Sequence, residues 1–422
     1  MPIPSLGSAS SGIVAMQADL NTIGNDIANS ETTGFASQTA EFQDLLTQQL
    51  QPATAPVGQT IASTNPSTIG TGVGVAAIGT NFSQGSINQT GVNSDVAIVG
   101  NGFLTVQQGA NTYYTRDGNL QIDANGNLAT NSGALVQGWA PGQPTTGPTG
   151  PLTISVGSMG QPVQTSNVNL VGNLPSNATG PITATTTMYD SLGNTVPITL
   201  TFTPTISGGS VTGWSMQGTV TGATATLWSS PQTLTFASNG QLKTVNGTAV
   251  TSSASAVPIS TEPSGYTWSG TTMPTFTFPA VGSQQAVTQY AGNQSIVATA
   301  NGNAAGTLQS YSIGSTGVIT GTYSNGNTAS LGTIALAQFA NPNGLQEIGN
   351  TNFSATVASG AAQVGQPGAG GLGTLQSGAL EGSNVDLASQ LTNLIEAQTA
   401  YQADTKVITS TETALGSLMQ IP

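Results

Sequence analysis

The chemistry open to this chain is limited by two residue types that it lacks, histidine and cysteine. Without them it can build no Ser-His-Asp triad, no thiol nucleophile and no usual transition-metal site. A pair of carboxylates could still hydrolyse a glycosidic bond, and Asp117 and Asp123 are the best candidates. Each lies in or beside a predicted turn, where aspartate is common because it hydrogen-bonds the local backbone. The turn interpretation is favoured, so we expect no enzymatic activity.

Other possible binding sites are equally weak. The segment DANGN, starting at Asp123, faintly resembles a calcium loop, but its glycine is misplaced and no acid stands at the final ligand position. The glycine-rich stretches lack the strand-to-helix setting of a phosphate-binding loop. Trp214, Trp228 and Trp268 could form a platform for a sugar, although packing in a core is the commoner role. We therefore expect no metal and no cofactor.

The charge balance excludes several classes of partner. Only 5% of the residues are charged, against roughly 25% in a typical soluble protein. Lysine and arginine total three and the acids sixteen, for a formal net charge of −13. Three scattered cations cannot neutralise a row of phosphates, which argues against nucleic acid and against an anionic membrane surface. No stretch approaches 18 consecutive apolar residues, so we expect no membrane insertion.

A long helix is predicted at the C-terminal end, over 385–419. Apolar side chains recur every seven residues and a second row lies between them, which is the narrow stripe of a coiled-coil seam. The first row is Leu387, Leu394, Tyr401, Ile408 and Leu415. The second row is Leu391, Gln398, Thr405, Glu412 and Met419. Ser383 or Asn384 could cap the start of this helix, with Asp386 in its first turn.

The N-terminal segment 6–28 repeats the same three-four spacing. Its apolar positions are Leu6, Ala9, Ile13, Met16, Leu20, Ile23 and Ile27. The two helices could form a hairpin that joins the termini of one domain, or they could pack between subunits. Such narrow seams with alternate polar positions bury little within one chain, which favours assembly. The predicted assembly interface comprises Leu6, Ile13, Leu20, Ile27, Leu387, Leu391, Leu394, Tyr401, Ile408 and Leu415.

Between the helices the hydrophobic period changes to two, which indicates β-structure. Asp117-Gly118 and Asn125-Gly126 are both predicted hairpin turns. The predicted fold is multidomain and mainly β, with paired terminal helices and sandwich- or barrel-like outer domains. Composition divides the chain into a helical assembly domain (1–30 and 383–422), extended connectors (31–74 and 366–382), an inner β domain (75–145 and 283–365) and an inserted outer β domain (146–282).

The two ends of the chain carry a family resemblance. LNTIGNDIANSETTGFASQTAEFQDLL, near the start, resembles the N-terminal signature of the bacterial flagellar rod and hook axial proteins. The residues that match its motif are Ala28, Asn29, Thr33, Gly34 and Phe35. GALEGSNVDLASQLTNLIEAQTAYQADTKVI resembles the C-terminal signature of this family, and YYTRDGNLQIDANGNL and MYDSLGN resemble its hook branch. The length of 422 residues also favours hook over rod; the scarcity of charge departs from the family's usual pattern.

The resemblance implies an extracellular tubular polymer, the flagellar hook, which acts as a universal joint that carries torque from rod to filament. It also implies export through the flagellar type III apparatus without a cleaved signal peptide, and contacts with rod, hook-cap and hook–filament junction proteins. Three alternatives remain: a distal-rod protein, a secreted β-rich adhesin and a polysaccharide hydrolase. Ligand binding by an isolated 75–365 fragment would support the adhesin, and turnover that depends on Asp117 or Asp123 would support the hydrolase.

Overall fold

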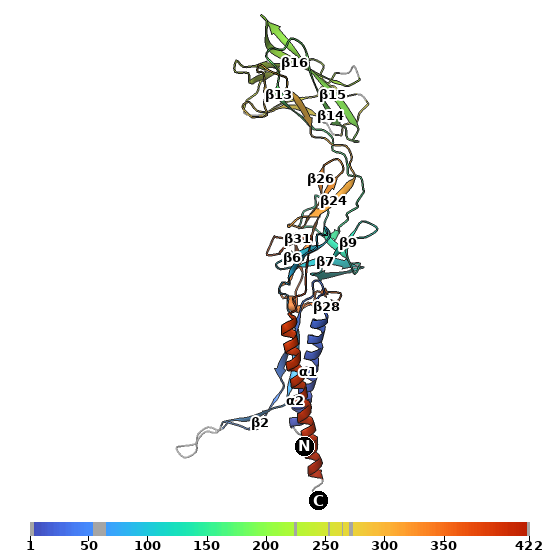
Figure 1. The fold of residues 1–422 in the computed structure, drawn as a ribbon, viewed down its shortest axis with the longest axis vertical. Coiled ribbons are helices and arrows are strands. Elements are labelled where there is room, and N and C mark those ends of the chain that lie inside the picture. Colours follow the sequence, from blue (N-terminus) through green and yellow to red (C-terminus); the bar gives the residue numbers. More distant parts are fainter. Residues whose placement is uncertain are drawn as a thin grey trace, which may run out of the picture. The chain divides into compact units, whose positions relative to one another are not determined.

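The structure is a computed structural model of the 422-residue chain, and it describes residues 4–53, 65–222, 226–251, 254–263, 265–269 and 273–419. Part of the predicted first connector, 54–64, lies outside the described residues. The described chain is mainly β with one long helix at each end (Figure 1), which confirms the predicted fold class. Contacts divide it into two compact units. Unit 1 comprises Met1–Ser155, Tyr311–Gly321 and Ala329–Pro422, and unit 2 comprises Val156–Ser310 and Thr322–Thr328.

Unit 1 contains both helices, α1 (Pro4–Ala28) and α2 (Leu387–Met419). They pack against each other with the chain termini at the same end, so they run antiparallel (Figure 1). No proline interrupts either helix after its first residue, and α2 extends for roughly 50 Å at 1.5 Å per residue. The predicted caps of α2 are wrong. Asp386 caps the helix instead, because its Oδ1 accepts the backbone N–H groups of Ala388 (3.0 Å) and Ser389 (3.4 Å).

Most of unit 1 is β-structure. Its early strands are β1 (Gln38–Asp44), β2 (Thr47–Gln51), β3 (Ser67–Gly70), β4 (Val73–Thr80), β5 (Ile87–Gln89), β6 (Val96–Val99), β7 (Phe103–Gln108), β8 (Asn111–Thr115), β9 (Leu120–Ile122), β10 (Leu128–Thr130), β11 (Leu135–Trp139) and β12 (Gly150–Pro151). Its late strands are β27 (Leu336–Gln338), β28 (Gln346–Gly349), β29 (Asn352–Ser354), β30 (Gln363–Gly365), β31 (Thr374–Ser377) and β32 (Ala379–Glu381), with a short 3₁₀ helix at Pro342–Gly344. Strands β24 (Leu308–Ile313), β25 (Val318–Tyr323) and β26 (Thr328–Ile334) run across the boundary between the units.

Pairing in unit 1 joins segments from the two halves of the chain. Strand β7 pairs with β8, β11 and β27, and β8 pairs with β29. The strands just before α2 pair in the same way, β31 with β6 and β32 with β5. An aromatic cluster of Phe103, Tyr114, Phe339 and Phe353 fills one part of the core. Unit 1 therefore forms only when the returning chain docks on the outgoing one.

One of the two predicted hairpin turns is present. Strands β9 and β10 pair across the turn at Asn125-Gly126, as predicted. Asp117-Gly118 makes no hairpin, because β8 and β9 pair with other strands. Gly118 instead lets the backbone approach β6. An added Cβ would lie 1.6 Å from the carbonyl oxygen of Val96, so no other residue fits there.

The predicted connector 31–74 contains strands. Strand β1 pairs with β4 and packs on α1, and β2 pairs with β3 in a separate two-stranded ribbon. Most side chains of both ribbons are exposed, so the composition is polar enough to look like a linker. Backbone pairing, rather than burial, makes this segment a ribbon. Strands β31 and β32 likewise lie within the predicted second connector, 366–382.

Unit 2 is a two-sheet sandwich. One antiparallel sheet has the order β14 (Ile182–Tyr189), β15 (Thr195–Ser207), β16 (Ser210–Val220), β17 (Gln232–Phe236), β18 (Leu242–Val245) and β19 (Thr248–Ala249). The other contains β20 (Ser255–Pro258), β21 (Thr275–Phe278), β13 (Asn167–Asn173), β22 (Val287–Thr288) and β23 (Val297–Ala300). Alternate side chains of both sheets form one core. Contacts assign 283–310 to this unit, whereas the sequence-based division gave those residues to the inner β domain.

The tryptophans of unit 2 belong to that core. Trp214 and Trp228 are almost fully buried, and the ring of Trp228 meets that of Phe276 edge to face at 5.0 Å. Trp268 is also buried. None of the three can therefore form an exposed platform for a sugar.

Candidate assembly surface

The buried positions of the helix pair are mostly small or polar. In α1, Ala9, Ala15, Thr22 and Asp26 are buried together with one large apolar side chain, Ile23, and Ala397 is the most buried described side chain of α2. Gly12 lies so close to α2 that an added Cβ would come within 2.3 Å of Oδ2 of Asp404. The helices therefore approach each other closely at Gly12, where any side chain would collide with Asp404.

The predicted interface residues are only partly covered within the protomer. Ile13, Leu20 and Ile27 of α1 are half-buried, and Leu6 is exposed. On α2 the half-buried positions of the first predicted row are Leu394, Tyr401, Ile408 and Leu415. Leu387 and Leu391 are exposed, Leu391 by 51%. Between the members of the first row, the covered side chains include Gln390, Ala397, Asp404 and Thr411, each one residue before a member of the second predicted row. Of that second row, Thr405 is half-buried, and Leu391, Gln398 and Glu412 are exposed.

Further large apolar side chains of unit 1 face solvent. On α2 these are Ile395, Val407 and Met419, and on the ribbons they are Phe42, Leu45, Leu46, Leu50, Ile69 and Ile78. Leu387, Leu391 and Ile395 follow one another four residues apart, so they form an exposed apolar strip on one face of α2, and exposed apolar patches mark interaction surfaces. Leu387 and Leu391 belong to the predicted interface, whereas Ile395, Val407 and the exposed side chains of the ribbons do not.

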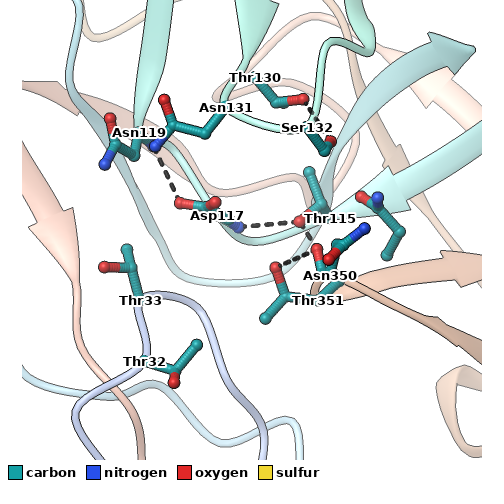
Figure 2. Close-up of a pocket in the computed structure, with 11 residues that line it drawn as sticks. Thr32, Thr33, Thr115, Asp117, Asn119, Thr130, Asn131, Ser132, Asn350 and Thr351 are labelled. Carbon is teal, nitrogen blue, oxygen red and sulfur yellow. Dashed lines mark hydrogen bonds between the residues drawn. The ribbon is translucent and has the colours of Figure 1, made fainter. Parts of the chain in front are cut away.

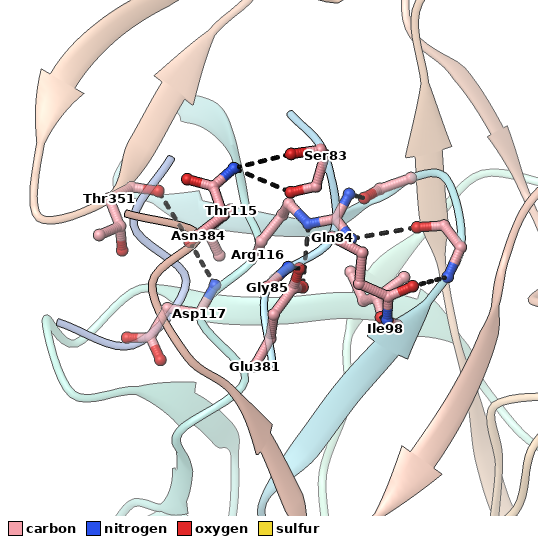
Figure 3. A network of polar contacts seen from close by, with 12 residues as sticks. Ser83, Gln84, Gly85, Ile98, Thr115, Arg116, Asp117, Thr351, Glu381 and Asn384 are labelled. Atoms are coloured by element: carbon pink, nitrogen blue, oxygen red, sulfur yellow. Dashed lines mark hydrogen bonds and ion pairs between the residues drawn. The ribbon is translucent and has the colours of Figure 1, made fainter. Parts of the chain in front are cut away.

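Within unit 1, a buried ion pair joins Arg116, just after β8, to Glu381 in β32, the strand that leads into α2 (Figure 3). Nε of Arg116 donates to Oε2 of Glu381 at 3.0 Å, and Nη2 donates to the carbonyl oxygen of Gly100 at 3.1 Å. Oε1 of Glu381 accepts the backbone N–H of Gly85 at 3.0 Å. Both charged groups are thus paired and hydrogen-bonded, which is the condition for keeping charges in an interior.

The segment between α1 and β1 reaches the same place. Asn29 ends α1 by donating from Nδ2 to the carbonyl oxygen of Asn25, while its Oδ1 accepts the hydroxyl of Thr32. Gly34 then adopts a φ of +67° and donates its N–H to the carbonyl oxygen of Glu381 at 2.8 Å. A Cβ at Gly34 would lie 2.6 Å from the backbone nitrogen of Asp117. This motif glycine therefore supplies both a left-handed turn and a close approach to β8's end.

The remaining motif residues flank that turn. Phe35 is buried, Thr33 is half-buried and Ala28 is exposed at the end of α1. Asn384 closes the junction from the α2 side (Figure 3). Its Oδ1 accepts the N–H of Ser37 at 2.7 Å, and its Nδ2 donates to the carbonyl oxygen of Ser83 at 2.9 Å. Asn384 is thus a cross-link between three chain segments rather than a helix cap.

Asp26 is a buried carboxylate at the same end of the helices. It accepts the N–H of Gln38 in β1 at 3.1 Å and the Nε2 amide of Gln390 in α2 at 2.9 Å. Burial raises the pKa of Asp26 to about 6, with the N–H of Gln38 opposing the rise and Glu347 adding to it. Its charge state therefore changes near neutral pH.

The two candidate catalytic carboxylates, Asp117 and Asp123, lie in different places and make different contacts. Asp117 lines a pocket of about 430 Å³ whose other walls are threonine, asparagine and serine side chains (Figure 2). Burial raises the pKa of Asp117, and the nearby charge of Asp95 raises it further. The hydrogen bond from the backbone N–H of Asn119 has the opposite effect and lowers it. Asp123 does not line this pocket. Its carboxylate holds the next turn by accepting the N–H groups of Asn125 and Asn127, and hydrogen bonds from Asn127 lower its pKa.

The aspartates therefore form no acid–base pair in one pocket. Among the described residues, no three histidine, cysteine, aspartate or glutamate side chains cluster as a metal site requires. No described helix is both long enough and apolar enough to cross a bilayer. The features that set this molecule apart are its helix pair, its exposed apolar rows and the cross-linked junction.

The sequence is similar to known proteins over its full length. Over 98% of both chains, this sequence is 34% identical to the flagellar hook protein FlgE of Escherichia coli strain K12. The chain belongs to the flagellar hook protein family. It is 35% identical to the FlgE of Salmonella typhimurium strain LT2 over 99% of this chain and all of that one. The FlgE of Borreliella burgdorferi is 32% identical over 99% of each chain.

Three domain families of flagellar proteins also match separate segments of this chain. Residues 97–167 match the flagellar hook protein FlgE/F/G D1 domain, 173–303 match the flagellar basal body protein FlaE D2 domain, and 376–421 match the flagellar basal body rod FlgEFG protein C-terminal region. A crystal structure of the Helicobacter pylori hook protein FlgE2 aligns with 70% of this chain and all of that chain, at 12% identity and a TM-score of 0.49.

Proposed function

We propose that this chain is the structural subunit of a bacterial flagellar hook, and that copies of it assemble into a flexible tube that carries torque from rod to filament. Full-length similarity to hook proteins at 32–35% identity supports this role. The observation that carries the self-assembly is the row of large apolar side chains that α2 leaves exposed, including Leu387, Leu391 and Ile395. Such a row is stable in water only when a neighbour covers it.

The predicted interface follows from this arrangement. The half-buried residues Leu394, Tyr401 and Ile408 contribute to packing within the helix pair and are only partly covered by it. The exposed residues are available to other copies. We propose that a neighbouring subunit completes the cover along the whole row, with the helices forming the inner layer of the tube and the β units the outer layers.

Finer contacts are proposed from family membership. The ends of the polymer would contact the rod, the hook cap and the hook–filament junction proteins, and the subunit would leave the cell through the flagellar type III apparatus. The proposed location is the hook, outside the cell. Neither the distal-rod role nor the adhesin role has a specific observation in its favour, because the full-length relatives are hook proteins and the tryptophans of unit 2 are buried.

Leu391→Asp tests the proposal. Leu391 is 51% exposed, so the new carboxylate stays hydrated in the protomer and is desolvated only when a neighbour covers it. An unpaired buried carboxylate costs several kcal/mol, so the critical concentration for assembly should rise by about a hundredfold or more. Sedimentation and electron microscopy under polymerising conditions measure assembly, and circular dichroism checks the fold.

Thr392→Asp is the matched control, since Thr392 is the next residue of α2 and is also exposed. The same charge there should affect assembly much less. Normal tubes from Leu391→Asp would sink the proposed interface. Loss of the β-structure in that variant would do so too, because it would place the helix in an intramolecular core.

A further inference from the structure

The ribbon of β2 and β3 has one apolar face and one polar face. Leu46 lies just before β2, and its carbonyl oxygen accepts the N–H of Thr71 at 3.0 Å, so the pairing of the ribbon extends to it. Side chains alternate along a strand, so Leu46 and Gln48 point to one side, and Ile69, which pairs with Gln48, joins them. Leu50 is the extra residue of a β-bulge between Gln49 and Gln51. Leu46 is 83% exposed, Leu50 63% and Ile69 38%. The opposite face carries polar side chains, among them Gln49.

This ribbon lacks the support that an isolated pair of strands needs. Every residue of β2 and β3 is exposed, and within the described chain these strands pair only with each other. Two-stranded sheets are marginally stable in water unless a further layer packs on them. An amphipathic ribbon with a bare apolar face is therefore built to be covered by something outside the described protomer.

A groove that suits this face lies on the helix pair. It has a volume of about 320 Å³ and lies between α1, β1 and α2. Apolar side chains line much of it, namely Met16, Ala40, Phe42, Ala397 and Ala400, and the acids Asp19 and Glu396 also line it. The groove can therefore take one or two aliphatic side chains, and it presents carboxylates to any hydrogen-bond donor beside them.

We propose that the apolar face of the β2–β3 ribbon of one copy packs into the groove between α1, β1 and α2 of a second copy. The charge pattern favours this occupant. Strands β2 and β3 carry no charged side chain, so they meet the acidic groove without repulsion. The amide of Gln48, which shares this face with Leu46 and Ile69, can donate to Asp19 or Glu396. The inference rests on the proposed function and specifies one contact within the tube.

The geometry of such a contact matches the proposed polymer. The ribbon and the groove are different surfaces of one chain, so the contact is heterologous. Each copy then offers a free ribbon to one neighbour and a free groove to another. Contacts of this type close into rings or continue as open helices, which is how a tube of identical subunits grows.

The absence of cysteine allows a direct test, because engineered thiols have no competitors. Leu46→Cys and Ala400→Cys together should produce, on oxidation of polymerised protein, a ladder of dimers, trimers and higher species on a non-reducing gel. Gln49→Cys with Ala400→Cys is the matched control, since Gln49 lies on the polar face of the same ribbon. We expect about tenfold less cross-linking from it, because a disulfide forms only where the Cα atoms come within about 7 Å.

Each other outcome overturns the inference. An equal or weaker ladder from the Leu46 pair than from the control excludes this docking, and intact wild-type tubes in the same experiment leave the proposed function standing. A cross-link within single, unpolymerised chains would show that the ribbon covers its own groove. Failure of wild-type protein to form any polymer would instead count against the proposed function.

Charge substitutions give a second measure if the double cysteine variant assembles poorly. Leu46→Asp should raise the critical concentration about tenfold or more, since burying a leucine is worth at least that factor in an equilibrium constant. Gln49→Asp should change it by less than about threefold. Equal effects of the two substitutions would contradict docking through the apolar face.

Discussion

Unit 2 and the helix pair of unit 1 differ in how far they bury their large apolar side chains. In unit 2, Phe202, Trp214 and Phe276 are essentially fully buried between two sheets of the same chain. In α2, the most buried described side chain is an alanine, and Leu387, Leu391 and Ile395 are exposed. Unit 2 thus completes its own core, whereas the helix pair leaves much of its apolar surface exposed within the protomer.

The difference separates two sources of stability. A sandwich with a closed core is stabilised by burial within the chain. In unit 1 the junction next to the helices is also held by polar contacts between distant segments, above all Arg116 with Glu381 and Asn384 with Ser37 and Ser83. Substitutions in the junction should therefore weaken unit 1 and leave unit 2 unchanged. Hydrogen exchange followed by peptide in increasing denaturant can report the two units separately.

The largest effect is expected from Arg116→Met. It leaves Glu381 buried without its cation, which costs about 3 to 5 kcal/mol for a broken buried pair. Peptides of unit 1 should lose protection at lower denaturant, and those of unit 2 should not. Lys243→Met is the control, because Lys243 is an exposed cation of unit 2 and its loss should cost less than about 0.5 kcal/mol. If Arg116→Met and Lys243→Met lowered stability by similarly small amounts, the ion pair at the junction would not be important for the stability of unit 1.

An intermediate effect is expected at the turn between α1 and β1. Gly34→Ala puts a side chain at a φ of +67° and 2.6 Å from backbone, so unit 1 should lose about 2 kcal/mol. Gly24→Ala lies in α1 with open space around it and should instead stabilise the helix by about 0.5 to 1 kcal/mol. Denaturant midpoints measure both. If the two alanines acted in the same direction, the close approach at Gly34 would not matter.

The smallest effect concerns pH. The pKa of Asp26 is raised to about 6 in the folded chain from an ordinary value near 3.8, so folding favours the protonated form. The stability contributed by Asp26 is fully present below about pH 3.8 and is lost as the pH rises through about 6. Relative to Asp26→Asn, wild-type unit 1 should therefore be about 1 to 2 kcal/mol more stable at pH 5 than at pH 7.5.

Unit 2 is the internal reference for that titration, because Asp26 lies outside it. The difference between wild type and Asp26→Asn should appear in unit 1 peptides alone. A difference that is constant between pH 5 and pH 7.5 would contradict the raised pKa. A difference in unit 2 would show that the two units unfold together.

Local pattern predicted the elements better than their partners. The heptad row of Leu394, Tyr401 and Ile408 was sufficient to place α2, because period and length are properties of the segment itself. The second row was assigned to Leu391 and Gln398, since either an i+3 or an i+4 neighbour can share a helical stripe. Gly12 of α1 favours the alternative, because its missing side chain leaves room for Asp404, seven residues after the buried Ala397.

Other features could not be predicted from one sequence. Arg116 and Glu381 are 265 residues apart, and nothing in their local sequence indicates that they pair. The β2–β3 ribbon resembles a linker because its residues are mostly polar and exposed. The polar composition of 31–74 and 366–382 predicts exposed side chains. It does not predict the strands there, because these form by backbone pairing with other segments. The Asn125-Gly126 turn was predictable because its hydrogen bonds are local, held by Asp123.

The position of Glu381 also has a mechanical consequence. Its side chain binds Arg116 and Gly85, and its carbonyl oxygen accepts the N–H of Gly34, where the chain leaves α1. Glu381 itself lies on the strand that leads into α2. Glu381 is therefore a point where a load on either helix can pass to the β-structure, shared with the bonds of Asp26 and Asn384 nearby. In a tube that bends as it turns, this residue fastens both helices of each subunit to the domain that they must drive.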